Sequence, residues 1–114
     1  MKVYLAGPYT ASTSEQVDKN IQQAREVMAV LLEHGHSVYC PHSMTGQMER
    51  THPEIDDFVY MESHMSWLKH CDAVVLLPGW ERSRGSQVEF HRAQNEGVHV
   101  YLSLADFLNH TGGQ

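Results

Sequence analysis

The sequence predicts an α/β fold, a small Rossmann-like three-layer sandwich around a four- to five-stranded, mainly parallel sheet. Short apolar runs alternate with segments of helical periodicity along the chain, which is the pattern of strands joined by helices. Residues 73–77 form an unbroken apolar run, typical of a strand buried on both faces of a parallel sheet. A chain of 114 residues has room for one core. We therefore expect a single domain over residues 1–109 and a frayed tail over residues 110–114.

The first predicted unit is a strand, a helix and a second strand. The strand covers residues 3–6 and ends at Gly7-Pro8, a pair that forces a turn. Ser12 and Glu15 form a capping-box pattern, which starts a helix that ends at Gly35. Its apolar positions recur at helical spacing: Val17, Ile21, Ala24, Met28, Leu31 and Leu32. The second strand, residues 37–40, stops at Pro41, and the unit predicts a parallel pair with a right-handed crossover.

The middle of the chain predicts a long loop and then a second helix. Residues 42–52 lack periodicity, so we expect a loop that folds over a ligand. An acidic first turn beginning at Pro53 predicts a helix that ends near His70. Its apolar face comprises Ile55, Phe58, Val59, Met61, Met65 and Leu68.

The last third of the chain predicts two more strands, each followed by a helix. The strand at residues 73–77 precedes a helix over residues 86–96, which Gly97 closes. A further strand over residues 98–102 follows, and Ser103 caps a short helix over residues 104–109.

The composition excludes several classes of function. The net charge is −6 and no basic run offsets it, so we expect no nucleic-acid polymer as partner. No apolar run approaches the roughly 18 residues of a membrane span, and we expect no membrane contact and a cytoplasmic protein. The nine histidines lack the spacing of metal ligands. We expect neither a metal nor a cofactor.

Two loops follow predicted strands at the sheet edge where ligands bind in such folds. The second loop holds Ser83, Arg84 and Gly85, and these residues precede a helix whose free N–H groups favour an anion. Glu89 lies about one helical turn further on, where a carboxylate can attack a sugar whose phosphate the loop holds. The alternative is that Ser86 and Glu89 form a capping box.

Three stretches together resemble one family. The stretches "VYLAGPYT" and "CDAVVLLPGWERSRG", together with Glu89, resemble the nucleoside 2-deoxyribosyltransferase-like superfamily, especially its small phage and bacterial members. That superfamily also holds the 2′-deoxynucleoside 5′-phosphate N-hydrolases. The resemblance covers residues 1 to about 108 in order, and the block from Leu76 to Glu89 is its most specific part.

The resemblance implies roles for particular residues. Glu89 looks like the nucleophile of a retaining displacement at C1′. Ser83 and Gly85 match the positions that bind a 5′-phosphate, and the matching loop against sugar and base is Gly7, Pro8 and Tyr9.

Two positions depart from the family pattern. His64 stands where the family usually carries an Asp that contacts or protonates the leaving base. A histidine can still donate a proton near neutral pH, and the alternative is a solvent-facing helix residue. Thr10 stands near the place of a phosphate-binding arginine, so Arg82 or Arg84 would have to substitute. Trp80 either stacks on a base or seals the core.

These inferences lead to one expected function and two alternatives. We expect an N-glycosidase that hydrolyses the base–sugar bond of a (deoxy)ribonucleoside 5′-monophosphate through a covalent glycosyl-Glu intermediate. The alternatives are a nucleoside 2-deoxyribosyltransferase and a non-catalytic nucleotide-binding protein. The expected partners are a small-molecule nucleoside or nucleotide and further copies of the chain, in a homodimer or higher oligomer. Phe58, Met61, Met65 and Trp67 offer apolar surface for that contact, or else face their own sheet.

Overall fold

The computed structural model describes residues 1–111, and it has the predicted α/β architecture. Four parallel strands form one sheet in the order β2-β1-β3-β4. The strands are β1 (Lys2–Ala6), β2 (Ser37–Tyr39), β3 (Ala73–Leu76) and β4 (His99–Tyr101). The helices are α1 (Ser14–Glu33), α2 (Pro41–Thr45), α3 (Met48–Thr51), α4 (Asp57–Leu68), η1 (Trp80–Arg82), α5 (Arg84–Asn95) and α6 (Leu104–Thr111).

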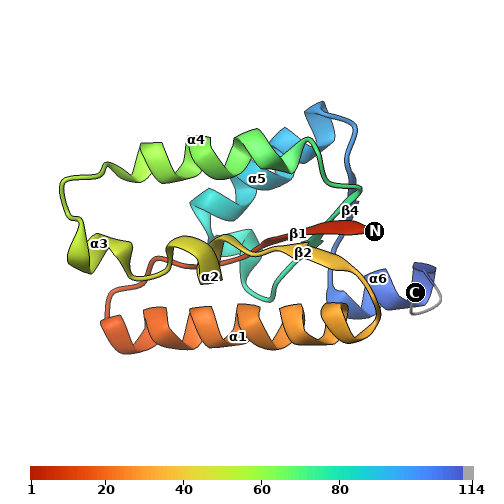
Figure 1. Ribbon diagram of the computed structural model, residues 1–114, viewed down its shortest axis with the longest axis horizontal. Coiled ribbons are helices and arrows are strands. Elements are labelled where there is room, and N and C mark those ends of the chain that lie inside the picture. Colours follow the sequence, from red (N-terminus) through yellow and green to blue (C-terminus); the bar gives the residue numbers. More distant parts are fainter. Residues whose placement is uncertain (112–114) are drawn as a thin grey trace.

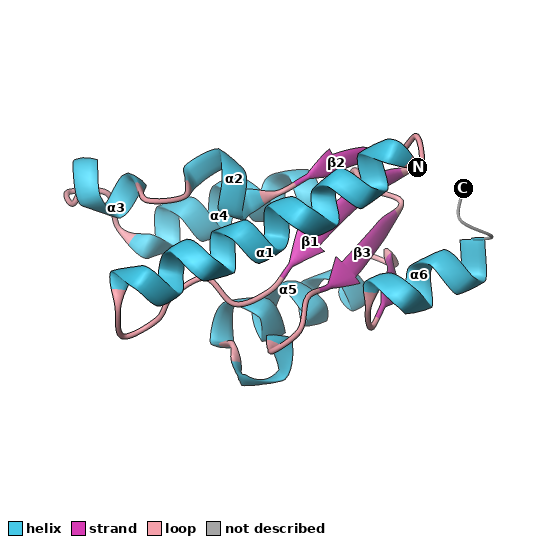
Figure 2. Ribbon diagram, turned by 90° about the horizontal axis from the view of Figure 1, so that it is seen from below, coloured by secondary structure: helices cyan, strands magenta, loops and turns pink. Residues whose placement is uncertain are grey.

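The sheet is the middle layer of three (Figure 1). Helices α1 and α6 cover one face, where Val3, Leu5 and Val75 pack in the core, and Figure 2 shows both helices in front of the strands. Helices α4 and α5 cover the other face, where Tyr4 and Val74 lie. The two central strands, β1 and β3, are buried on both faces, so the apolar run at residues 73–77 was a reliable signal.

The predicted strands and long helices are confirmed, but the helix caps differ. Thr13 caps α1, because its side-chain oxygen accepts from the backbone N–H of Gln16 at 3.1 Å; the Ser12 cap was therefore wrong by one residue. Gly35 closes α1 at φ +86°, as expected for a left-handed position. The last helix runs to Thr111, so residues 110 and 111 are helical and the predicted fraying at these two positions was wrong; residues 112–114 lie outside the described part.

Residues 42–52 do not form the predicted long loop. They fold into the short helices α2 and α3, separated by Gly46 and Gln47. Pro41 is the first residue of α2, where proline's missing N–H costs nothing. Helices of four and five residues are too short to show periodicity, which is why no pattern in the sequence indicated them. We call residues 41–51 the strap.

Helix α4 begins four residues after Pro53. Asp56 is its cap, since its carboxylate accepts from the N–H of Phe58 at 2.8 Å. The predicted apolar face is broader than the buried one: Met65 and Leu68 are buried, whereas Phe58 and Val59 are exposed. The carboxyl-terminal half of α4 therefore packs on the sheet, while its first turn carries apolar side chains into solvent.

Candidate functional site

Glu89 is buried on α5, on the face that packs against the sheet. The residue is 7% exposed, and its carboxyl Oε2 accepts a hydrogen bond from the hydroxyl of Tyr4 on β1. The capping-box interpretation of Glu89 was wrong, because the helix starts two residues before Ser86 and Ser83 is its cap. Glu89 thus bonds a side chain of the central strand and not the backbone of its own helix.

The two oxygens of the Glu89 carboxyl differ. Within residues 1–111, Oε1 accepts no hydrogen bond, yet it is not among the fully buried polar atoms that lack a partner. Part of the small exposed area of Glu89 is therefore on Oε1. Tyr4 holds Oε2 by a hydrogen bond, whereas Oε1 has no hydrogen-bond partner within the described residues.

Burial controls the charge of this carboxyl. Loss of solvent raises the pKa of Glu89 to about 8, and the hydrogen bond from Tyr4 lowers the pKa in part against that trend. The group is therefore mostly neutral in the free protein at pH 7.

Tyr4 is a site residue that the sequence analysis missed. It is 0% exposed and its ring stacks on that of Tyr39, with centroids 5.4 Å apart and planes at 8°. A tyrosine in a fully buried strand needs a partner for its hydroxyl. That requirement was the available signal, and the partner is Glu89.

His64 joins this group from α4 through Tyr39. Its Nδ1 lies 3.0 Å from the Tyr39 hydroxyl, and its Nε2 lies 2.9 Å from Oγ1 of Thr45 in the strap. Since the Thr45 hydroxyl donates to the Pro41 carbonyl, it accepts from Nε2–H, and Nδ1 accepts from Tyr39. The residue is 6% exposed, so the alternative of a solvent-facing residue was wrong. Burial lowers the pKa of His64, and nearby His42 lowers it further.

The loop after β1 is held rigidly by its backbone. The Pro8 carbonyl accepts from Nε2 of His42 at 3.0 Å, and the Tyr9 carbonyl accepts from Nδ2 of Asn20 at 3.0 Å. A Cβ on Gly7 would lie 2.5 Å from Cβ of Leu77, so only glycine allows the two central strands to end side by side.

Tyr9 ties the strap to this loop. Its hydroxyl donates to the carboxylate of Glu49, at 2.7 and 2.8 Å from the two oxygens, and accepts from the N–H of Gln47 at 2.6 Å. Gln47 adopts φ +67°, which is uncommon for a residue other than glycine. Desolvation raises the pKa of Tyr9 to about 12. The residues expected to face sugar and base are therefore engaged with the strap in this structure.

The turn before α5 contains the expected residues Ser83, Arg84 and Gly85, and two of them also stabilise the local structure. The Ser83 hydroxyl accepts from the backbone N–H and the hydroxyl of Ser86, at 3.2 and 2.9 Å. A Cβ on Gly85 would meet Met61 at 3.3 Å, so this glycine also serves the packing of α4 on α5. Arg84 is exposed at the helix start.

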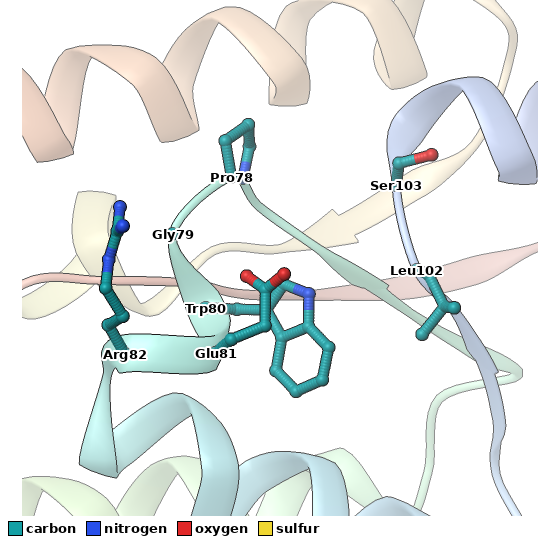
Figure 3. A pocket seen from close by; sticks show the side chains of 7 residues that line it. All are labelled: Pro78, Gly79, Trp80, Glu81, Arg82, Leu102 and Ser103. Atoms are coloured by element: carbon teal, nitrogen blue, oxygen red, sulfur yellow. The ribbon is translucent and has the colours of Figure 1, made fainter.

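Arg82 reaches toward the β1 loop. A Cβ built on Gly79 would lie 3.2 Å from Pro8 and 4.0 Å from the Arg82 guanidinium, so both groups lie near Gly79. Figure 3 shows its side chain directed away from those of Trp80 and Glu81. Arg82 is therefore closer to the expected sugar loop than its sequence position indicated.

Trp80 packs against Phe90, with ring centroids 5.2 Å apart. It also lines a cavity of about 450 Å³ that involves neither Glu89 nor the loop after β1 (Figure 3). The structure thus brings together Glu89, Tyr4, Tyr39 and His64, and it places Trp80 at a neighbouring cavity.

Residues 1–111 contain neither a metal-binding group nor a membrane-spanning helix. In that part of the chain, no group of three or more His, Cys, Asp or Glu side chains is arranged to hold a metal ion. None of its helices has the length and apolar character needed to cross a bilayer.

The fold and this group of residues define a class, Rossmann-like α/β proteins with a buried carboxyl beside the central strand. Residues 1–102 match the family described as a domain of unknown function, DUF4406, and the chain belongs to that family. It is also similar in structure to a 2-deoxyribosyltransferase from the psychrotolerant bacterium Bacillus psychrosaccharolyticus, with a TM-score of 0.62 and 19% identity over 90% of this chain and 71% of that one. This likeness confirms the fold that the sequence resemblance implied. No curated protein matches the sequence.

Proposed function

We propose that the protein is an N-glycosidase that cleaves the base–sugar bond of a (deoxy)ribonucleoside 5′-monophosphate, with Glu89 as nucleophile. One observation carries the proposal: the Glu89 carboxyl is buried beside the central strand, with Oε2 held by Tyr4 and Oε1 unbonded. A surface carboxylate kept for solubility needs no such environment. The shared fold with a 2-deoxyribosyltransferase supports the same class of chemistry.

The proposed reaction has two steps. Oε1 of ionised Glu89 attacks C1′, a glycosyl ester forms, and the C1′–N bond breaks so that its electron pair leaves with the base. Water then attacks C1′, the ester bond breaks, and the carboxylate is restored. Tyr4 holds the carboxyl in one orientation throughout, which reduces the entropy lost on reaching the transition state.

His64 is the proposed partner of the leaving base. Its lowered pKa weighs against an imidazolium at neutral pH, so we assign it a hydrogen bond from neutral Nε2–H to the base. That proton now points to Thr45, and the strap must shift for the bond to form. A base that is a good leaving group without full protonation suits this arrangement.

A 5′-phosphate is the proposed anchor of the substrate. Ser83 uses its oxygen to accept from Ser86, which leaves its own hydroxyl proton to donate. The N–H groups at the start of α5 favour an anion, and exposed Arg84 adds positive charge to a chain of net charge −6. Arg82, which like Pro8 lies near Gly79, is a second candidate cation.

The test is incubation with deoxyribonucleoside 5′-monophosphates, followed by chromatography for free base. We expect base release, abolished in Glu89→Gln and retained in Glu96→Gln, an exposed acid at the other end of the same helix. We also expect the corresponding nucleosides without phosphate to react at least tenfold more slowly. Undiminished release by Glu89→Gln would exclude the nucleophile.

Base exchange is the alternative enzyme activity. A transferase yields product only when an acceptor base is added, because the glycosyl ester must resist water until the second base binds. The same chromatography with and without acceptor base separates the two activities.

The enclosure of Glu89 favours a second candidate, a nucleotide-binding protein without turnover. The carboxyl is only 7% exposed and is mostly neutral at pH 7, and a neutral carboxyl does not repel a bound phosphate. Calorimetry that detects nucleotide binding while no base is released over hours would favour this candidate over the glycosidase.

A further inference from the structure

The cavity that Trp80 lines lies beyond the carboxyl ends of β3 and β4, and Glu89 does not line it. Its volume is about 450 Å³, within the range of small-ligand pockets. Its lining residues are Pro78, Gly79, Trp80, Glu81, Arg82, Leu102 and Ser103. Glu89 and Tyr9 are not among them, so the cavity does not include the proposed nucleophile, and it shares only Arg82 with the proposed phosphate anchor.

Two apolar side chains form opposite walls of this cavity. The Trp80 indole is held in place by its contact with Phe90. Leu102 directs its side chain toward the indole across the cavity (Figure 3) and is 58% exposed. An indole facing an exposed leucine leaves a slot whose two sides are apolar, and a flat ring fills such a slot with the least loss of rotational freedom.

The lining of the cavity holds one carboxylate acceptor, Glu81, beside donors on Trp80, Arg82 and Ser103. Glu81 is exposed, and no cation within residues 1–111 forms an ion pair with it. Its neighbour Arg82 points to the other side of the turn (Figure 3). Ser103 is fixed because its hydroxyl oxygen accepts from the N–H of Asp106 at 3.0 Å. A ligand that donates a hydrogen bond to Glu81 would therefore meet an unsatisfied carboxylate.

We propose that this cavity binds a flat nitrogen heteroaromatic ring with an exocyclic amino group, of the kind found in adenine and cytosine. The ring lies between Trp80 and Leu102, and the amino group donates to the Glu81 carboxylate. Binding needs neither Glu89 nor turnover. The proposal therefore stands or falls independently of the glycosidase reaction.

The chain itself supplies the reporter for a direct test. It has two tryptophans, so Trp67→Phe leaves Trp80 as the single indole. We would titrate this variant with adenine, cytosine, hypoxanthine and uracil and follow Trp80 fluorescence, excited where the bases do not absorb. Hypoxanthine and uracil are matched controls, because each carries a carbonyl where its partner carries the amino group.

We expect saturable quenching by adenine and cytosine, with binding at least tenfold weaker for hypoxanthine and uracil. Glu81→Ala in the same background should remove that preference, whereas Glu96→Ala should keep it. Glu89→Gln should leave the titration unchanged. Equal binding of all four bases, no saturable quenching, or loss of binding in Glu89→Gln would each overturn the proposal, the last because the ring would then occupy the candidate site.

Discussion

At the scale of single residues, the hydrogen bond between Tyr4 and Glu89 is the central feature of the molecule. It joins β1 to α5 across 85 positions of sequence. Neither residue predicts the other from sequence, because Glu89 alone is typical of a helix start and Tyr4 alone is typical of a strand. Sequence pointed to Glu89 through its spacing from Ser83 and Gly85, whereas Tyr4 required knowledge of which strand α5 covers.

Replacing Glu89 changes how stability depends on pH. The pKa of Glu89 is raised to about 8 in the folded protein, against 4.5 in an unfolded chain. Above pH 4.5, Glu89 therefore ionises in the unfolded chain but stays protonated in the folded protein. For this reason the free energy of unfolding decreases as the pH rises to about 8, and it does not decrease further above that pH. We expect the free energy of unfolding of the native protein to fall by a few kcal/mol more between pH 5 and 8 than that of Glu89→Gln. Urea unfolding at several pH values measures this; parallel curves would contradict it.

Removing the Tyr4 hydroxyl raises the pKa of Glu89 further, because that hydrogen bond lowers it. If Glu89 is the nucleophile, kcat/KM rises as the pH passes through the pKa of Glu89 in the free protein. We expect the rise to move to higher pH in Tyr4→Phe, with activity at pH 7 reduced at least threefold. Tyr39→Phe is the control, since Tyr39 stacks on Tyr4 but bonds His64 instead. A profile that shifts equally in both variants would contradict the assignment.

At the scale of elements, the close approach of β1 and β3 sets the positions of both loops. Gly7 has no room for a Cβ because the Cβ of Leu77, which can move only with its backbone, would be 2.5 Å away. Gly85 has slightly more room, since its neighbour is the flexible end of Met61 at 3.3 Å. Two glycines near the same site thus differ in what they tolerate.

Urea unfolding of Gly7→Ala and Gly85→Ala tests this difference. We expect Gly7→Ala to lose about 1–3 kcal/mol, because strands or Leu77 must move. Gly85→Ala should change stability by less than about 0.5 kcal/mol, since Met61 yields and alanine favours the helix. Similar losses in both variants would show that the contact at Leu77 does not govern the strand ends.

The elements also show where sequence reasoning ends. Buried parallel strands have few polar positions, so the run at residues 73–77 identified the centre of the sheet without ambiguity. Helix starts at Ser12, Pro53 and Ser86 were misplaced because several polar residues in a row satisfy the same capping pattern. Which of these polar residues caps the helix depends on how the helix packs against the rest of the protein. At the start of α5, for example, Gly85 lies against Met61 of α4, and a contact between distant residues cannot be predicted from the local sequence.

At the scale of the whole molecule, the exposed part of α4 indicates an assembly. Phe58, Val59 and Trp67 are 67%, 54% and 55% exposed, which is unusual for large apolar side chains on one helix. We propose a homodimer with α4 at the contact. Met65 packs against its own sheet and is not part of the proposed contact.

Light scattering tests the assembly. We expect about twice the chain mass of 13.0 kDa for the native protein and a single chain mass for Phe58→Glu. Leu32→Glu is the matched control, since Leu32 is 52% exposed on α1, the helix on the opposite face of the sheet. A monomeric native protein, or a dimer that Leu32→Glu disrupts, would contradict the contact at α4.

The strap has a kinetic consequence for turnover. It contributes one buried side chain, His42, and is otherwise held by polar contacts to Tyr9, His64 and helix α1. Such a segment detaches at a small fraction of the free energy needed to unfold the domain. If the proposed bond from His64 to the leaving base requires the strap to shift, the frequency of this detachment sets an upper limit on the turnover rate, whatever the ligand concentration.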